Sequence, residues 1–222
     1  MSPPVSGSFG PVGIIPLGSS NDLAKTLGIP LDPAGSVAAI ARGKGTLIDL
    51  ARVNDRFFVL NAAIALEAQA GRIQSGISWI SGPVRYKLAS LLCILDARHW
   101  SARLTWDAGT YTGPLMHLTV GNAPRTGGFY VAPHADVRDG LLTCVYMPEK
   151  SRADLLRILP KMLNGPGDGD YTEEPGVFEI HTPWLEVELE TASPAHADGE
   201  ILPHELTRLS FSLRKQCLEI LV

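Results

Sequence analysis

The chain has 222 residues, of which 45% are hydrophobic and 19% are charged, and its formal net charge is −4. This length is enough to bury the core of one large domain or two small ones, and the slightly acidic balance argues against a nucleic-acid partner. Three separated cysteines, the lack of an export signal and the lack of an apolar run of about 20 residues favour a cytoplasmic protein without disulfides, structural zinc or transmembrane segments.

The first elements along the chain alternate between strand and helix. Residues 12–17 read as a buried strand, and a polar turn leads from it into a short helix near Asn21, which ends at Gly28. Ser20 or Asn21 is suited to cap that helix. A second helix is expected from Asp32-Pro33 to Gly43.

The pattern changes after residue 45, where short strands recur about every ten residues. An Asn54-Asp55 turn joins two of them, and the expected helices are 83–98 and 151–163. The expected strands are 46–53, 56–63, 102–106, 110–112, 115–120, 129–131, 141–147, 177–181, 184–189, 206–213 and 217–222. We therefore predict an α+β, mainly β fold with a C-terminal antiparallel sandwich or barrel.

The stretch GIIPLGSSNDLAK places a polar turn between a strand and a helix N-terminus. Such a turn can present backbone N–H groups and a positive helix end to a phosphate. It matches neither the glycine fingerprint of dinucleotide folds nor the lysine-bearing phosphate loop, and by themselves these residues favour a tight structural connection.

Two later stretches carry carboxylates on turns. Asp136 and Asp139, closed by Gly140, suit Mg²⁺ or Ca²⁺, or they form Asx turns with the local backbone. Asp198 and Glu200 flank a glycine in HADGE, where they could supply a general base, bind Mg²⁺ through substrate phosphates, or form a plain Asp-Gly hairpin.

The motifs together resemble the diacylglycerol kinase catalytic family, including its bacterial lipid kinases and the sphingosine kinases. The resemblance extends from Gly13 to Val222 through GIIPLGSSNDLAKTLGIP, IDLARVNDRFFVLNAAIALEA, GPVRYKL, TGGFYVAPHADVRDGLL and ADGE. It implies an α/β nucleotide-binding domain followed by a β-sandwich, with the active site between them.

The resemblance also implies roles for individual residues. Asp198 matches the general base that accepts the proton of the lipid hydroxyl as it attacks the γ-phosphate of ATP, and Glu200 is its near neighbour. The residues that match the binding turn for ATP and its Mg²⁺ are Gly18, Ser19, Asn21 and Asp22.

A metal site on the sandwich is implied as well. Asp136, Asp139 and the carbonyl of Leu141 match metal ligands that support the fold, and Asp49 matches an aspartate of the surrounding network.

The resemblance predicts two units, a remnant of the nucleotide-binding domain at 1–45 and the sandwich at 46–222. Family members carry a Gly-Gly-Asp-Gly-Thr phosphate loop upstream of the opening turn, which this chain lacks, so an N-terminally truncated kinase is expected, with the strand at 12–17 lacking its sheet partners.

Three functions follow. The first is an ATP-dependent lipid kinase that meets its lipid substrate at a membrane surface, with peripheral membrane contact and a homodimer both compatible with the sequence. The second is an inactive relative that binds lipid or a partner. The third is a metal-dependent hydrolase built from a cluster of charged residues: His196, Asp198, Glu200, His204 and Glu205.

Overall fold

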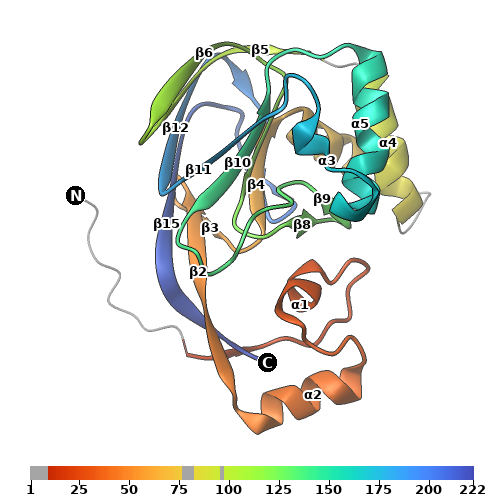
Figure 1. The fold of residues 1–222 in the computed structure, drawn as a ribbon, viewed down its shortest axis with the longest axis vertical. Coiled ribbons are helices and arrows are strands. Elements are labelled where there is room, and N and C mark those ends of the chain that lie inside the picture. The colour runs from red at the N-terminus through yellow and green to blue at the C-terminus, as the bar shows by residue number, and fades with distance from the viewer. Residues whose placement is uncertain (1–9, 77–82, 96–97) are drawn as a thin grey trace.

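The computed structural model describes residues 10–76, 83–95 and 98–222. Across these residues, two antiparallel sheets face each other, helices cover the outer face of one sheet, and a small N-terminal region lies at one end of the sandwich (Figure 1). The predicted mainly β fold with a C-terminal sandwich is confirmed.

The N-terminal region contains β1 (Val12–Gly13), α1 (Asp22–Leu27) and α2 (Pro33–Arg42). Gly28 and Gly43 end the two helices in the left-handed conformation, as predicted, and Asp32 caps α2 by accepting the N–H of Gly35 at 2.7 Å. The strand prediction for 12–17 was too long. The expectation that this strand lacks sheet partners was wrong too, because β1 pairs in parallel with the last residues of β15.

The first sheet has the order β3-β2-β15-β12-β5-β6, with β1 added beside β15. The β2–β3 hairpin turns at Asn54, whose φ of 48° supplies the left-handed residue that this turn needs without a glycine. Its strands are β2 (Gly45–Val53), β3 (Arg56–Phe58), β5 (Trp100–Trp106), β6 (Gly109–Leu115), β12 (Trp184–Ser193) and β15 (Leu206–Leu221).

The second sheet has the order β11-β10-β7-β4-β13-β14, and a separate hairpin joins β8 to β9. The predicted strand 56–63 is therefore two strands, since β3 and β4 belong to different sheets. The strands are β4 (Asn61–Ala65), β7 (His117–Gly121), β8 (Arg125–Thr126), β9 (Phe129–Tyr130), β10 (Leu142–Met147), β11 (Phe178–Thr182), β13 (Ala195–Ala197) and β14 (Glu200–Ile201).

The main core lies between the two sheets, where inward side chains such as Leu104, Leu185 and Phe211 meet Leu118 and Cys144. Burial in this core raises the pKa of the Cys144 thiol well above its ordinary value.

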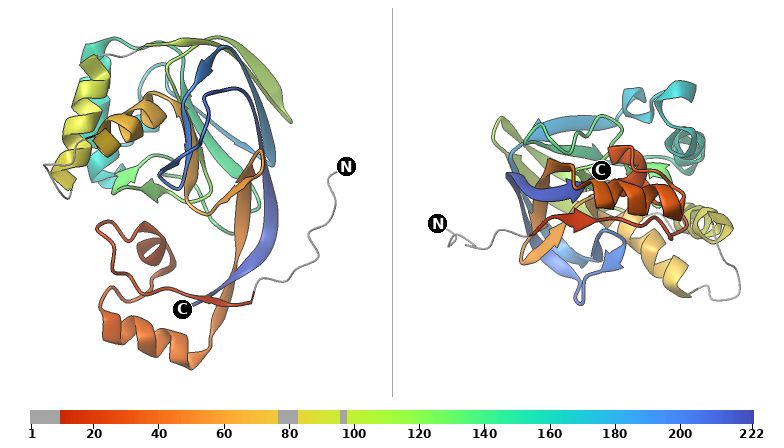
Figure 2. Two further views of the ribbon diagram at one scale, coloured as in Figure 1. Left: turned by 180° about the vertical axis from the view of Figure 1, so that it is seen from behind. Right: turned by 90° about the horizontal axis from the view of Figure 1, so that it is seen from below.

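Helices pack on the outer face of the second sheet (Figure 2). They are α3 (Leu66–Gly76), α4 (Pro83–Leu95) and α5 (Arg152–Asn164), followed by short 3-10 turns at Pro166–Asp168 and Tyr171–Glu173. The sequence predicted α4 and α5 but not α3, and residues 96–97 of the predicted 83–98 helix lie outside the described residues. Among the helices of the described residues, none is both long and apolar enough to cross a membrane.

The last strand joins the N-terminal region to the sandwich. β15 pairs with β12 over its first half, with β2 along most of its length, and with β1 at its end. A bulge between Arg214 and Leu218, with Gln216 at a φ of 45°, interrupts the pairing with β2. The two segments predicted at 206–213 and 217–222 are thus one bulged strand.

Candidate functional site

The turn at residues 18–22 is shaped by the side chain of Asn21. Its Oδ1 accepts the N–H of Gly18 at 2.9 Å, and its Nδ2 donates to the carbonyl of Pro16 at 3.2 Å. Asn21 occupies the cap position of α1 in a left-handed conformation but makes no side-chain bond to the helix. The turn leaves Gly18 and Ser19 exposed, and because α1 has only six residues its dipole contributes little.

Asp22 follows this turn and is buried against the β8–β9 hairpin. Its Oδ2 accepts the N–H of Gly128 at 3.0 Å, and its Oδ1 lies 3.7 Å from Nε of Arg125. The Arg125 guanidinium stacks over the ring of Tyr130 at 4.6 Å. Within the described residues, neither Asp22 Oδ1 nor Arg125 Nε has a hydrogen-bond partner. The predicted nucleotide turn therefore meets the sandwich at this hairpin.

Asp49 is fully buried in β2 and accepts two backbone N–H groups. Its Oδ2 bonds to the N–H of Gly140 at 2.7 Å, and its Oδ1 bonds to the N–H of Gln216 at 2.7 Å, which the β15 bulge aims toward it. The N–H of Asp49 donates to Val137. Asp49 thus fixes the loop that carries the predicted metal ligands onto the sheet.

Asp136 and Asp139 lie exposed on that loop and form the Asx turns that were one reading of their spacing. The Oδ1 of Asp136 accepts the N–H of Arg138 at 3.0 Å, and the Oδ1 of Asp139 accepts the N–H of Leu141 at 2.8 Å. Partial burial raises the pKa of Asp139, and the negative charges of Asp136 and Asp49 raise it further. Asp139 thus lies near enough to Asp136 and Asp49 for their charges to act on it.

Asp198 lies at the β13–β14 turn with a φ of 50°, and the backbone of residues 59–61 surrounds its carboxylate. Oδ2 accepts the N–H of Val59 at 2.8 Å, and Oδ1 accepts those of Leu60 at 2.8 Å and Asn61 at 3.1 Å. We call residues 59–61 the carboxylate nest. Burial raises the pKa of Asp198, while the three donors act in the opposite direction.

The residues of the hydrolase hypothesis do not form one site. Glu200 pairs with Arg56 at the surface, Glu205 pairs with Arg72, and His196 points into the interior toward Glu67. In the part of the chain that the structure describes, no three His, Cys, Asp or Glu side chains gather so as to hold a metal ion.

Residues 122–128 connect the three predicted sites. The N–H of Asn122 and that of the next residue donate to the carbonyl of Leu60, beside Asp198. Nδ2 of the buried Asn122 donates to the carbonyls of Asp49 and Val59, at 3.2 and 2.9 Å. At the other end of the segment, Gly128 bonds to Asp22. The segment therefore contacts Asp49 and the carboxylate nest at one end and the turn at the other.

A buried polar network beside the nest was not predicted from the sequence. Glu67, in the first turn of α3, accepts Nδ2 of Asn61 at 2.8 Å and the hydroxyl of Thr119, and it lies 3.3 Å from Nε2 of His196. Burial alone would raise the pKa of Glu67, but the His196 hydrogen bond, the nearby charges of His196 and His117, and the Thr119 hydroxyl lower it to about 2. Burial lowers the pKa of His117. A glutamate in an otherwise apolar run, NAAIALEA, was the available signal.

An apolar pocket lies on the other side of this network, with a volume of about 70 Å³. Glu67 and His117 form its polar wall. The rest of its wall comes from α3, α4, α5 and nearby strands: Leu66, Ala70, Cys93, Ile94, Phe129, Val131, Met147, Leu155, Ile158, Leu159 and Met162.

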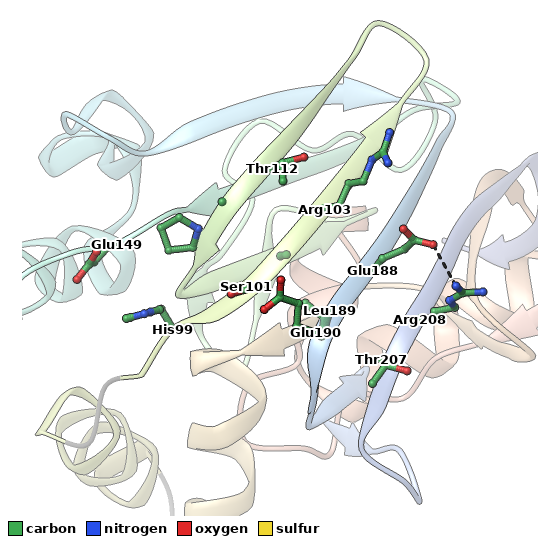
Figure 3. Close-up of a pocket in the computed structure, with 13 residues that line it drawn as sticks. His99, Ser101, Arg103, Thr112, Glu149, Glu188, Leu189, Glu190, Thr207 and Arg208 are labelled. Atoms are coloured by element: carbon green, nitrogen blue, oxygen red, sulfur yellow. Dashed lines mark ion pairs between the residues drawn. The ribbon is translucent and has the colours of Figure 1, made fainter.

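A wider hollow of about 890 Å³ lies on the outer face of the first sheet (Figure 3). Side chains of both charges line it, including Arg103, Glu188 and Glu190, and Arg208 pairs with Glu188 at 3.6 Å. This mixed, open surface is typical of the solvent face of an antiparallel sheet. None of the predicted site residues lies in it.

Comparison with protein families matches nearly the whole chain in two parts. The model of the diacylglycerol kinase catalytic domain matches residues 7–53, and that of the YegS C-terminal NAD kinase beta sandwich-like domain matches residues 62–222.

Curated relatives give the same result. The chain is 30% identical over 211 residues to a Pseudomonas aeruginosa protein named "Probable lipid kinase YegS-like", covering 94% of this chain and 67% of that protein. A protein of the same name from Chromohalobacter salexigens is 29% identical over 210 residues, covering 93% of this chain and 66% of the relative. A Staphylococcus aureus diacylglycerol kinase is 25% identical over 191 residues, covering 85% and 59%. The chain thus spans about two thirds of the length of these relatives.

A solved structure supports the fold. The crystal structure of a diacylglycerol kinase from Bacillus anthracis matches with a TM-score of 0.65 and 19% identity, covering 93% of this chain and 65% of the other.

Proposed function

Because the chain belongs to the family of diacylglycerol kinases and YegS-like lipid kinases, we propose that it transfers the γ-phosphate of ATP to a hydroxyl group of a lipid. The observation that carries this proposal is the segment 122–128, which connects the turn around Asp22 to the nest around Asp198. A phosphoryl donor and a proton acceptor must lie together for this reaction.

Asp198 is the proposed general base. In the reaction, the acceptor oxygen forms a bond to the γ-phosphorus, the bond from that phosphorus to the bridging oxygen of ADP breaks, and the hydroxyl proton passes to Asp198. The nest holds the carboxylate in one orientation. Within the part of the chain that the structure describes, Oδ2 accepts the N–H of Val59 alone, so it retains capacity for a hydroxyl donor. Burial raises the pKa of Asp198, which makes it a stronger base.

ATP is proposed to lie between the turn and the β8–β9 hairpin. The exposed Gly18 and Ser19 face solvent on the turn, and Asp22 and Arg125 supply opposite charges beneath it. An arginine at this position is suited to phosphate oxygens, which it binds through its planar fork of N–H groups. Ser20 on the turn lies close to Gly128, since a Cβ built on that glycine would be 4.0 Å from Oγ of Ser20.

Mg²⁺ fits the acidic loop by its chemistry. Asp136, Asp139 and the carbonyl of Leu141 would hold it, with water completing the shell, because Mg²⁺ prefers oxygen ligands and is commonly bound through one or two carboxylates. Burial raises the pKa of Asp139, the charges of Asp136 and Asp49 raise it further, and a cation would relieve that repulsion. When bound, the ion supplies positive charge that keeps the loop folded against β2.

The apolar pocket is proposed to receive part of the lipid chain. Phe129, next to Gly128 of the hairpin, lines it, so the pocket adjoins the proposed nucleotide site. Its 70 Å³ is the space of about two water molecules, so a longer chain requires α4 or α5 to move outward. Leu91, Leu92 and Leu95 on α4 and Leu156 on α5 expose 40–55% of their surface beside it.

The test is transfer of labelled γ-phosphate from Mg·ATP to vesicles that contain diacylglycerol or a total lipid extract. We expect labelled lipid with the unmodified chain, and a rate lower by about 10²–10⁴-fold with Asp198→Asn, since the amide cannot accept the proton.

Glu200→Gln is the matched control, because it removes a carboxylate two residues away that pairs with Arg56 at the surface. A folded wild-type chain that labels no lipid, or equal loss in both variants, would contradict the proposal.

A further inference from the structure

The buried network around Glu67 lies directly behind the proposed base and plays no part in the chemistry described above. We infer that Glu67 is a positioning residue, which acts through Asn61 to fix the nest that orients Asp198. The inference rests on the proposed role of Asp198 and deepens it, since it names a buried charge on which that role depends.

The first link joins Asp198 to Asn61 in both directions. The N–H of Asn61 donates to Oδ1 of Asp198 at 3.1 Å, and the N–H of Asp198 donates to the carbonyl of Asn61 at 2.8 Å. The position of Asp198 is therefore set by the backbone of Asn61. A shift of this residue would misalign the donors of the nest.

The second link joins Asn61 to Glu67. Nδ2 of Asn61 donates to Oε1 of Glu67 at 2.8 Å, and both side chains are buried, with exposed fractions of 0% and 8%. A hydrogen bond to an ionised acceptor is stronger than one between neutral groups, and burial strengthens it further. Glu67 is ionised because its pKa lies at about 2.

The third link anchors Glu67 itself. Thr119 on β7 donates its hydroxyl to Oε2, and His196 on β13 lies 3.3 Å from Oε1. His117, also on β7, lies 3.9 Å from Oε2. The carboxylate is thus held from two strands and from its own helix, so that it can serve as a fixed point for Asn61.

The charge of Glu67, and not only its shape, is required by this arrangement. Each carboxylate oxygen accepts from a different donor, Asn61 on Oε1 and Thr119 on Oε2. A glutamine has one oxygen and one NH₂ group, so it cannot accept from both. Even where the amide oxygen still accepts from Asn61, Glu67→Gln replaces an ionised acceptor with a neutral one, which weakens the hold on Asn61 while nearly preserving volume.

The first experiment measures the titration of Asp198 through the amides of the nest and does not depend on enzymatic activity. Amide proton shifts of Val59, Leu60 and Asn61 are followed by NMR against pH in the full chain, because these groups donate to Asp198 and report its titration. In Glu67→Gln and Asn61→Ala we expect the midpoint to rise by about 0.5 unit or more, since looser donors stabilise the carboxylate less. Faster hydrogen exchange of the Leu60 and Asn61 amides is expected in both variants.

Thr119→Val is the matched control. It removes a donor from the same buried carboxylate but leaves the bond between Glu67 and Asn61, so it should destabilise the chain while moving the Asp198 midpoint by less than half as much. An unchanged midpoint in Asn61→Ala, or an equal shift in Thr119→Val, would overturn the inference. Asn61→Ala decides the question if Glu67→Gln does not fold.

The second experiment measures lipid phosphorylation by the same variants. We expect kcat to fall about tenfold in Glu67→Gln, with KM for ATP changed less than twofold, because a misaligned base affects the transfer step and not nucleotide binding. An equal rise in KM for ATP would contradict positioning. If the wild type phosphorylates no lipid, the proposed function fails, while the titration still decides whether Glu67 positions Asp198.

Discussion

The turn at 18–22 and the Asp198 tip each present one aspartate to the proposed reaction, and they hold it in opposite ways. Asp198 accepts three backbone N–H groups at 2.8–3.1 Å. Asp22 accepts one, and its second oxygen lies 3.7 Å from Arg125, beyond hydrogen-bond distance. The hydrogen bonds of Asp198 are formed without a ligand, whereas at the turn Oδ1 of Asp22 has no hydrogen-bond partner within the described residues.

This difference follows from what holds each region. The nest is part of the sandwich, where the buried Asn122 donates to the carbonyl of Val59 and so helps to fix the backbone that binds Asp198. The turn rests on a short helix and a two-residue-per-strand hairpin, and Gly18 and Ser19 are open to solvent. Substitutions in the sandwich should therefore change stability most, and substitutions at the turn should change ligand binding.

Asp49→Ala should give the largest loss of stability, about 4 kcal/mol, because two N–H groups, of Gly140 and Gln216, lose a buried charged acceptor. Urea denaturation in the presence of a chelator measures it. Asp136→Ala removes the same charge from the exposed loop and should change stability by less than about 1 kcal/mol. Similar losses of stability in the two variants would show that the buried bonds of Asp49 stabilise the chain no more than the exposed loop does.

Stability should fall on acidification because of Glu67. Its folded-state pKa is lowered from 4.5 to about 2, so its ionised form stabilises the fold above pH 4.5, and that contribution disappears as pH falls through 2. It amounts to about 3 kcal/mol. The lowered pKa of His117 acts in the same direction from a higher pH. Denaturation at several pH values should show a flatter profile below pH 4.5 in Glu67→Gln, and an unchanged slope would argue against a buried anion.

Asp22→Ala should weaken binding of Mg·ATP about tenfold, or about 1.4 kcal/mol, because the hairpin loses the carboxylate that holds the N–H of Gly128 and lies beside the guanidinium of Arg125. Calorimetric titration measures the change. Asp32→Ala is the control, since it removes the cap of α2 at a cost of about 1 kcal/mol in stability but should leave ATP affinity unchanged. Equal affinities in all three chains would show that the turn does not bind nucleotide.

The smallest effects should come from two glycines, one in each region. Gly128 and Gly199 have φ angles of 85° and 81°, so alanine at either should cost about 1 kcal/mol in stability. A Cβ on Gly128 would lie 4.0 Å from Oγ of Ser20, whereas one on Gly199 meets no atom within 4 Å. Only Gly128→Ala should alter ATP affinity. An equal effect of Gly199→Ala would contradict the placement of ATP at the hairpin of Gly128.

Local signals in the sequence predicted much of the fold. Gly28, Gly43 and Asp32 end or begin helices as their chemistry requires, and the alternation along 184–189 gave β12 correctly. The strand over 56–63 was wrong because a continuous apolar run carries no sign that the chain crosses from one sheet to the other after Phe58.

The candidate site residues were predicted from a family resemblance and not from local signals. The roles of Asp22, Asp136 and Asp198 came from a family resemblance, and their assignment to catalysis, metal or nucleotide stays a prediction. The network of Glu67 could not be predicted, because its partners at 61, 119 and 196 lie far apart in sequence and meet only through the pairing of β4 with β7 and β13. Helix α3 was missed because it follows β4 without a turn residue.

The long strand β15 limits how far the N-terminal region can move relative to the sandwich. A single ribbon carries β12 near its start and β1 at its end, so the N-terminal region cannot swing freely about a loop. Any movement of the N-terminal region away from the sandwich must twist β15, and the hydrogen bonds of the sheet oppose that twist. The bulge between Arg214 and Leu218 interrupts the ladder with β2, but the bond from the N–H of Gln216 to Asp49 fixes it to the sheet. The N-terminal region is therefore attached to the sandwich through a continuous strand that is also held at its irregular point.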